Sequence, residues 1–452
     1  MIDVVVVGAG VTGLTTALRL HEAGLDVLVL EARDRVGGRL YTETVDGVRL
    51  EIGGQWVSPD QSALLAMIDE LGLETYPRHR DGDSVYIGRD GVRRTFQGEA
   101  FPVPDATAAE MQRIIKELDS LAARMDPLVP WEHPDAERLD RMSFAAWLAE
   151  QTEDAEARDN VGLYVGPAML TKPAHSFSAL SAVLMAASAG GFSHLVDADF
   201  ILDRRVVGGL QEVPVRLAAR LPGRVRLGEP VLRVTWDAEG ATVHTGAGEY
   251  RARRVVMAVP PTLVNRVQYV PALPPVQAQM RQHQSFGLVL KLHITYETPF
   301  WRAAGLSGTA FSPYALVHEA YDNTNEDVPG ETRGTLVGFV SDEKADGVLA
   351  LDTEIRRARV LESLAAYYGD QALHPVAYYE SPWVADEWTA GAFGTSFDIG
   401  SLTRYGEHLR ADVGPLAFAS SDVAGLGFQH VDGAIRMGEA VAARLLSLRD
   451  GR

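Results

Sequence analysis

A glycine-rich turn between two apolar runs is the feature that most constrains this fold. Residues 3–7 (DVVVV) form a β-branched run that predicts a buried strand, and GAGVTG follows at 8–13. Residues 13–23 have helical spacing, Gly24 is a typical helix stop, and the apolar run 26–31 predicts a second strand. This order implies a β-α-β unit, and therefore a parallel sheet with a right-handed crossover.

The glycines of this turn have the spacing and context of a dinucleotide-binding site. Gly8 permits the tight turn, Gly10 lets the backbone approach a pyrophosphate, and Gly13 lets the helix pack on the strand. The helix N-terminus offers free N–H groups to the phosphates. Glu31, after the second strand, can accept hydrogen bonds from ribose hydroxyls, and its charge disfavours a 2′-phosphate. A tight turn that binds no ligand is the alternative.

A second glycine pair follows in the segment EARDRVGGRLYT. Gly37 and Gly38 lie there among Arg33, Arg35 and Arg39. A flavin dinucleotide is long and must be held along its whole length, so extra backbone N–H donors and arginines near its phosphates favour a flavin. A solvated basic loop is the alternative.

The charge balance argues against a nucleic-acid partner. Of 452 residues, 42 are Lys or Arg and 61 are Asp or Glu, which gives a formal net charge of −19. A nucleic-acid binder needs a basic face to neutralise phosphates. The acidic balance is compatible with a cationic substrate, although it could equally serve solubility alone.

The absence of cysteine excludes further classes of chemistry. Without cysteine there is no disulfide, no thiolate metal site, no Cys nucleophile and no cysteinyl-linked cofactor. We see no secretory leader and no uninterrupted apolar run of about 18 residues. We therefore expect a cytoplasmic protein that binds neither a membrane nor a metal.

The order of elements along the chain indicates two interleaved domains. Helices are predicted over 105–125, 135–160, 176–190, 343–368 and 431–448, a β-meander within 204–275, and strands over 284–297 and 333–340. We see no tandem repeat and no long linker, so the simplest account assembles each domain from separated segments.

Long segments along the chain also carry a family resemblance. They include VVVVGAGVTGLTTALRL, VLVLEARDRVGGRLYT, LEIGGQWVSPDQ, DRRVVGGLQEVPVRLA, GLVLKLHITYETPFW, EWTAGAFGTSF and VDGAIRMGEAVA. In this order they resemble the flavin-containing amine oxidases, the monoamine and polyamine oxidase family. Within the family, FILDRRVVGGLQ and SSDVAGLGFQHVDGAIRMGE are most similar to bacterial putrescine oxidases.

The resemblance implies an α/β fold with α+β elements, divided into two domains. A Rossmann-like FAD-binding domain would comprise residues 1–78, 200–280 and 390–452. A substrate domain with a mixed sheet and helices would comprise 79–199 and 281–389.

It also implies oxidation of a primary aliphatic amine, such as putrescine or a related diamine or N-alkyl diamine, to an aldehyde, ammonia and H₂O₂. Flavin N5 accepts a hydride from the carbon beside an unprotonated nitrogen, and O₂ reoxidises the flavin. Lys291, within GLVLKLHI, matches the family lysine that holds a water against N5. A buried lysine is costly unless it is paired. An edge-strand lysine that reaches solvent is the alternative.

Two side chains are implied to flank the substrate nitrogen in front of the flavin. They are Phe393, in GAFGTSF, and His430, in GFQHVDG, where a tyrosine is commoner. Core packing is the alternative for each. Ala392 occupies the position of the flavin-linking cysteine of covalent members, so the resemblance implies that FAD is bound non-covalently.

Further FAD contacts follow from the resemblance alone. They are Ala32, Arg33, Gly38, Arg39, Gly54, Gln55, Trp56, Val231, Trp388, Ser421, Asp422 and Val431. Ser421 and Asp422 stand where the family usually has Thr-Glu, and the shorter Asp422 weakens the case for direct contact.

A diamine carries a second ammonium, which needs an anionic partner when it is buried. Glu319, in ALVHEAYDNTN, is the candidate, and a surface carboxylate is the alternative. Phe200, Leu426 and Phe428 are further candidate substrate contacts. Together with Phe393, Leu426 and Phe428 predict a more apolar cavity, which would favour longer, N-alkylated or monoamine substrates.

Three other functions stay open at this point. An L-amino acid oxidase would need an arginine clamp, for which Arg204, Arg205 and Arg302 are candidates. A flavin-binding protein without turnover is disfavoured by Lys291, and a lipid desaturase by the lack of an anchor. The predicted partners are the amine and O₂, and a homodimer is compatible with the sequence.

Overall fold

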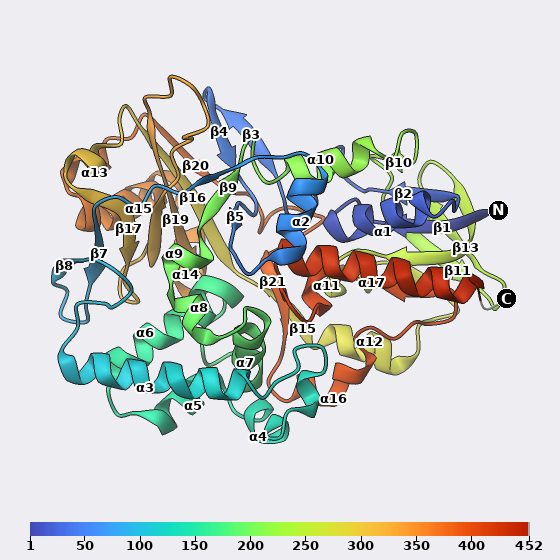
Figure 1. Cartoon of the computed structure of the whole chain (residues 1–452), viewed down its shortest axis with the longest axis horizontal. Coiled ribbons are helices and arrows are strands. Elements are labelled where there is room, and N and C mark those ends of the chain that lie inside the picture. The colour runs from blue at the N-terminus through green and yellow to red at the C-terminus, as the bar shows by residue number, and fades with distance from the viewer. Residues whose placement is uncertain (451–452) are drawn as a thin grey trace.

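The computed structural model describes residues 1–450, and two large sheets organise it (Figure 1). The first sheet has eight strands and contains the predicted unit of β1 (Ile2–Val7), α1 (Val11–Glu22) and β2 (Val27–Leu30). β1 pairs in parallel with β2 and with β13 (Glu249–Met257). β1 and β2 are valine-rich because the strands of a parallel sheet are covered on both faces.

The rest of the first sheet comes from later parts of the chain. Its order is β10-β2-β1-β13-β12-β11-β14, and β22 also pairs with β13. α1 packs against α17 (Val431–Asp450), so helices from opposite ends of the chain lie side by side (Figure 1). The other strands are β10 (Val225–Arg226), β11 (Val231–Trp236), β12 (Ala241–Thr245), β14 (Gln268–Val270) and β22 (Leu416–Phe418).

The second sheet has seven strands in the order β20-β16-β19-β18-β17-β7-β8. β16 pairs with β19 on one side and with β20 on the other, so it is an interior strand. One face of this sheet packs on α15 (Thr353–Tyr368) in a shared apolar core. The strands are β7 (Asp83–Ile87), β8 (Arg93–Phe96), β16 (Val289–Tyr296), β17 (Leu306–Phe311), β18 (Glu319–Asp322), β19 (Gly334–Ser341) and β20 (Ala377–Glu380).

Smaller elements complete the fold. The short strands are β3 (Thr42–Val45), β4 (Val48–Glu51), β5 (Trp56–Val57), β6 (Thr75–Pro77), β9 (Arg204–Val206), β15 (Gln284–Gly287) and β21 (Ala392–Phe397). The other helices are α2 (Ser62–Glu70), α3 (Asp105–Ala122), α4 (Ala136–Asp140), α5 (Phe144–Gln151), α6 (Ala155–Val165), α7 (Ala179–Ser188), α8 (Phe192–Val196), α9 (Ala198–Ile201), α10 (Glu212–Ala219), α11 (Pro261–Val264), α12 (Pro275–Gln282), α13 (Phe300–Ala303), α14 (Glu343–Leu349) and α16 (Ser401–Tyr405).

The predicted α/β class with a Rossmann-like sheet is confirmed. The segment 135–160, predicted to be helical, is divided into separate helices. Three short helices occupy that segment. The Ser143 hydroxyl accepts a hydrogen bond from the Ala146 amide, and the Asp154 carboxylate accepts one from the Ala157 amide. These N-caps start new helices and divide the segment.

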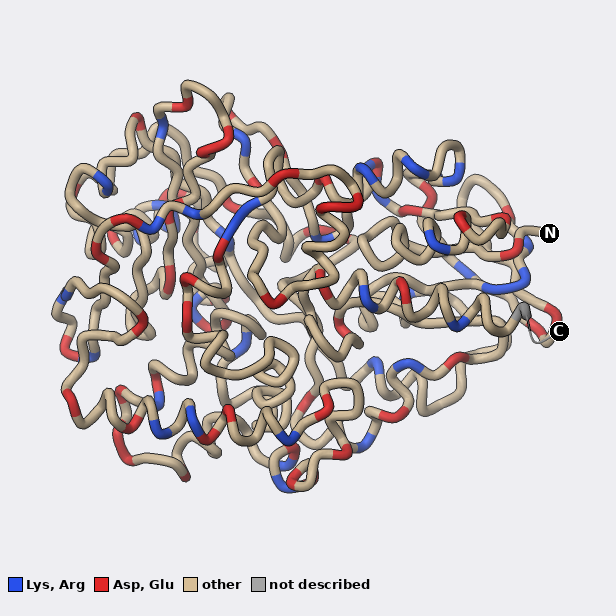
Figure 2. The backbone as a smooth tube through the Cα atoms, in the orientation of Figure 1, with Lys and Arg blue, Asp and Glu red and all other residues tan. Residues whose placement is uncertain are grey.

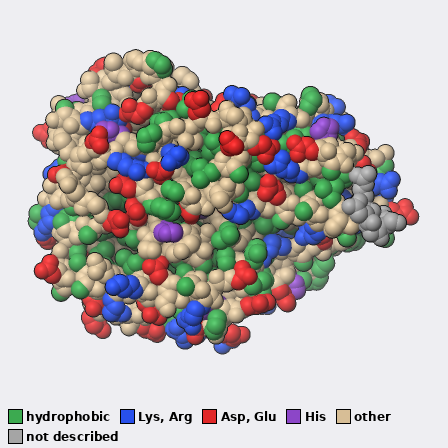
Figure 3. Space-filling model, viewed as in Figure 1, with side chains coloured by type: hydrophobic (Ala, Val, Ile, Leu, Met, Phe, Trp, Pro, Cys, Tyr) green, Lys and Arg blue, Asp and Glu red, His purple; other side chains and the backbone are tan. Residues whose placement is uncertain are grey.

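Every strand of each large sheet falls inside the segments predicted for one domain, although the domain boundaries themselves stay a prediction. Charged residues of both signs are spread along the chain (Figure 2), and on the visible face they are interspersed with apolar side chains (Figure 3). Within residues 1–450, no helix has both the length and the hydropathy that crossing a bilayer requires.

Candidate active site

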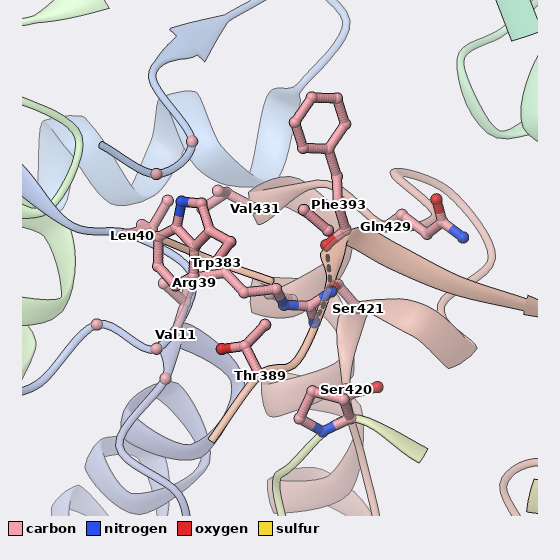
Figure 4. A pocket seen from close by; sticks show the side chains of 18 of the residues that line it. Val11, Arg39, Leu40, Trp383, Thr389, Phe393, Ser420, Ser421, Gln429 and Val431 are labelled. Carbon is pink, nitrogen blue, oxygen red and sulfur yellow. Dashed lines mark hydrogen bonds between the residues drawn. The ribbon is translucent and has the colours of Figure 1, made fainter. Parts of the chain in front are cut away.

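A cavity of about 560 Å³ lies between the glycine turn of the first sheet and the face of the second sheet that is opposite α15. Figure 4 shows one part of it, where Arg39 meets Ser421 and Phe393. The predicted residues that line the cavity are Gly8, Gly10, Glu31, Ala32, Arg33, Gly38, Arg39, Gly54, Gln55, Trp56, Val231, Lys291, Glu319, Trp388, Phe393, Ser421, His430 and Val431.

The glycine turn forms an open cradle at one end of the cavity. Gly8 has φ +104°, and a Cβ there would lie 2.7 Å from the Ala258 carbonyl oxygen. A Cβ at Gly13 would lie 2.0 Å from the Gly8 oxygen, whereas a Cβ at Gly10 would meet nothing within 4 Å. Gly8 and Gly13 therefore serve the close packing of the turn, and Gly10 leaves space in which a phosphate can approach the helix N-terminus.

Glu31 is fixed beside this cradle by backbone donors. Its carboxylate accepts hydrogen bonds from the Ala9 amide at 2.7 Å and the Arg33 amide at 3.0 Å. The side chain is buried yet lines the cavity. It is therefore positioned to accept hydrogen bonds from a ribose, as the position of an acidic residue after the second strand predicts.

Arg39 is clamped at the centre of the cavity (Figure 4). Its guanidinium donates to both carboxylate oxygens of Asp422 at 2.6 and 3.0 Å, to the Ser421 hydroxyl at 3.1 Å and to the Phe393 carbonyl at 2.9 Å. Asp422 is buried and does not line the cavity. Asp422 therefore acts on the site by holding Arg39, which is bidentate and so fixed in orientation.

Hydrogen bonds from Arg33 hold the segment 384–391 at the end of the cavity that contains the glycine turn. The Arg33 guanidinium donates to Asp386 at 2.5 Å and to the Thr389 hydroxyl at 2.6 Å. Trp388 lines the cavity from this segment. Sequence reasoning missed a second tryptophan, Trp383, which also lines the cavity and donates from its indole N–H to the Ile52 carbonyl at 2.8 Å.

Lys291 is fully enclosed on the interior strand β16, which excludes the solvent-reaching alternative. Its ammonium donates to the carbonyls of Glu51 and Gly53 at 2.7 Å each and to the Gln55 side-chain oxygen at 2.6 Å. Burial lowers the pKa of Lys291 to about 7. All three donors are used by the chain itself, so Lys291 orders the loop that carries Gly54 and Gln55 and has no ammonium donor left for the water that the resemblance implies.

The strand register places Lys291, Phe339 and Glu319 side by side. Lys291 pairs with Phe339, and Phe339 pairs with Glu319, across three adjacent strands. All three line the cavity. The Phe393 ring meets the Phe339 ring edge-on, with centroids 5.9 Å apart and planes at 86°. The cavity wall therefore carries the Lys291 amine at one end, an aromatic side chain in the middle, and a carboxylate at the other end.

Glu319 is buried in this wall, at 6% exposure, which excludes the surface-carboxylate alternative. It accepts a hydrogen bond from the Tyr321 hydroxyl at 2.8 Å, and His318 Nε2 lies 3.4 Å from its other oxygen. Tyr321 also lines the cavity. Sequence reasoning missed Tyr321, although the period of two along a strand places it on the same face as Glu319.

Five predicted site residues do not line the cavity: Gly13, Phe200, Asp422, Leu426 and Phe428. Phe428 is buried in the apolar core, and Leu426 is 48% exposed on a turn. Phe200 packs against the His194 ring at 4.4 Å between centroids. The expectation that Leu426 and Phe428 make the cavity more apolar is therefore wrong, because the turn directs Leu426 to solvent and Phe428 into the apolar core.

The arginines considered for a carboxylate clamp lie elsewhere. Arg205 is buried in an ion pair with Glu51 at 2.6 Å, and Arg302 pairs with Asp322 at 2.7 Å. Neither these two nor Arg204 lines the cavity. Among the described residues, no group of three or more His, Asp and Glu side chains could hold a metal ion.

The fold and the site define a flavin-dependent oxidoreductase. The family model described as flavin containing amine oxidoreductase matches residues 11–446, so the chain belongs to that family. Its cofactor is FAD, and the open Gly10 cradle, the oriented Glu31 and the clamped Arg39 fit the phosphates and ribose of such a dinucleotide.

Particular relatives are similar along their whole length. The putrescine oxidase of Kocuria rosea is 54% identical over 456 residues, covering 98% of this chain and 95% of the relative. A solved structure of wild-type putrescine oxidase bound to putrescine has 56% identity and a TM-score of 0.97, covering 99% of both chains. Cyclohexylamine oxidase from Brevibacterium oxydans IH-35A has 30% identity, a TM-score of 0.94 and 99% coverage of both chains.

Proposed function

We propose that this protein uses non-covalently bound FAD and O₂ to oxidise a short aliphatic diamine, with putrescine as the first candidate, to an aldehyde, ammonia and H₂O₂. The observation that carries the proposal is Glu319, a buried carboxylate on the same cavity wall as Lys291. A monoamine needs no such anion. Burying a carboxylate costs free energy, which a bound ammonium would offset.

Each end of the substrate has its own partner in this proposal. When bound, FAD accepts the hydride from the carbon beside the reacting nitrogen. Phe393 and His430 flank that nitrogen, and Glu319 holds the distal ammonium. Lys291 orders the loop at Gln55 beside the reacting end.

His430 has a defined tautomer at the reacting end. Its Nδ1 lies 2.8 Å from the Phe428 carbonyl oxygen, which can only accept a hydrogen bond. Nδ1 of the neutral ring therefore carries the proton, and Nε2 keeps a lone pair. In this proposal the lone pair accepts a hydrogen bond from the amine and orients its nitrogen at the reacting end.

The proposal is tested with a peroxide-coupled assay over a panel of amines. Putrescine and butylamine form the central pair, because both have four carbons and only putrescine has a second amine. Cadaverine, N-methylputrescine, spermidine, benzylamine and several L-amino acids complete the panel. We expect the highest kcat/KM with a diamine; activity on amino acids alone, or equal kcat/KM for putrescine and butylamine, would reject the proposal.

Three further attributes are proposed from the sequence. We propose a cytoplasmic protein that acts in polyamine catabolism and forms a homodimer. Light scattering of the purified holoenzyme tests the dimer, and cell fractionation tests the location.

A further inference from the structure

The carboxylate of Glu319 is held by another side chain of its own strand. Glu319 and Tyr321 are two residues apart on β18, so both side chains lie on the cavity face. The Tyr321 hydroxyl donates to Glu319 Oε2 at 2.8 Å. Both residues are buried, at 6% and 3% exposure, so this hydrogen bond is shielded from water.

The Tyr321 ring is fixed from three sides. Trp56 meets it edge-on with centroids 5.4 Å apart, and Phe311 does so at 5.7 Å. The Arg78 guanidinium lies 5.5 Å from the ring centroid and is itself held by the Thr309 hydroxyl at 3.0 Å. The hydroxyl therefore has a defined direction, and it points at the carboxylate.

The hydroxyl can act on the carboxylate only as a donor. Burial, followed by the charge of Glu319, raises the pKa of Tyr321 well above its ordinary value of 10. A hydrogen bond from a hydroxyl to an ionised carboxylate is stronger than one between neutral groups. The hydrogen bond from Tyr321 occupies Oε2 of Glu319 and leaves Oε1 for a cationic ligand. Oε1 lies 3.4 Å from His318 Nε2.

We propose that Tyr321 is a positioning residue for diamine specificity: it fixes the Glu319 carboxylate so that one oxygen faces the distal ammonium of the substrate. This inference rests on the proposed function, in which Glu319 is the anchor. Tyr321 acts through Glu319 and has no role at the reacting carbon. Its loss should therefore raise KM for diamines and leave kcat at saturation nearly unchanged.

The test replaces Tyr321 by phenylalanine, which keeps the ring packing and removes only the hydroxyl. A hydrogen bond to a charged group contributes enough that kcat/KM for putrescine should fall about tenfold or more. Butylamine, which has no second ammonium, should change by less than about twofold. Tyr86→Phe is the matched control, because the buried Tyr86 hydroxyl also donates to a glutamate, Glu156, at 2.8 Å and lies outside the cavity lining.

A double-mutant cycle with Glu319→Gln separates the possible failures. If Tyr321 acts through Glu319, Tyr321→Phe should cause little further loss of putrescine kcat/KM in the Glu319→Gln background. A full tenfold loss in that background, or equal losses for both amines, overturns the inference on Tyr321. If Glu319→Gln alone leaves the putrescine-to-butylamine ratio unchanged, the proposed anchor fails, and this inference fails with it.

Discussion

Glu319→Gln is the substitution to which the proposed function is most sensitive. The carboxylate is 6% exposed, so an ammonium bound to it loses most of its water and depends on the opposite charge. Removing one partner of a buried ion pair costs about 3–5 kcal/mol. At about 1.4 kcal/mol per factor of ten, kcat/KM for putrescine should fall between about a hundredfold and a few thousandfold.

The assay measures initial rates of peroxide formation with putrescine and butylamine. Butylamine should change by less than about threefold in Glu319→Gln, because it carries no charge at the distal end. Equal losses for both amines would refute the reasoning, since they would place the effect at the reacting end or on folding. Bound flavin is measured by absorbance in each variant, so that a loss of cofactor is not mistaken for a loss of substrate binding.

Glu319→Asp tests the geometry while keeping the charge. Two strand spacings separate Lys291 from Glu319, which is about 10 Å between the backbones. Aspartate retracts the carboxylate by one C–C bond, about 1.5 Å. The preference should therefore shift from putrescine toward cadaverine, which is one carbon longer. An unchanged length preference would contradict the assignment of Glu319 to the distal ammonium.

Three further predictions concern the cofactor and the reacting end. Asp386→Asn breaks the ion pair between Arg33 and the segment 384–391. FAD release, measured by flavin fluorescence after dilution, should therefore become faster than in wild type; an unchanged rate would show that this ion pair does not retain the cofactor. Lys291→Met removes a group whose pKa burial lowers from 10.5 to about 7. Between these two pH values the unfolded chain binds a proton that the folded chain has lost. The free energy of unfolding of the wild type should therefore rise with pH relative to that of the variant, as measured by denaturation at pH 7 and 9. A difference that stays constant with pH would contradict the burial of Lys291 as the cause. His430→Phe keeps an aromatic ring but removes the nitrogen lone pair, so kcat/KM should fall about tenfold or more at full flavin content. An unchanged kcat/KM would show that His430 serves only core packing.

Local patterns in the sequence predicted the glycine turn and the neighbouring position of Glu31 for a physical reason. Gly8, Gly10 and Glu31 belong to one β-α-β unit, in which the turn, the helix start and the second strand are fixed by neighbouring residues. Short-range chemistry is therefore enough to predict a phosphate site at Gly10 and a ribose site at Glu31.

The substrate end depends on strand register, which the sequence alone does not give. Phe339 and Lys291 become neighbours only when β16 pairs with β19, and Trp383 reaches the cavity from an irregular segment without period. Leu426 was wrongly predicted to line the cavity, because the sequence of a turn does not determine which of its side chains point to the interior. Tyr321 could have been predicted from Glu319 if residues 319–322 are taken as a strand, because side chains two positions apart lie on the same face.

The most direct test of the account is anaerobic mixing of the purified yellow holoenzyme with putrescine and, separately, with butylamine. The loss of the visible flavin absorbance reports reduction by the amine, without any contribution from O₂. We predict rapid bleaching by putrescine at concentrations at least a hundredfold below those needed for butylamine. Bleaching at the same concentration of either amine, or no bleaching by putrescine, would contradict it.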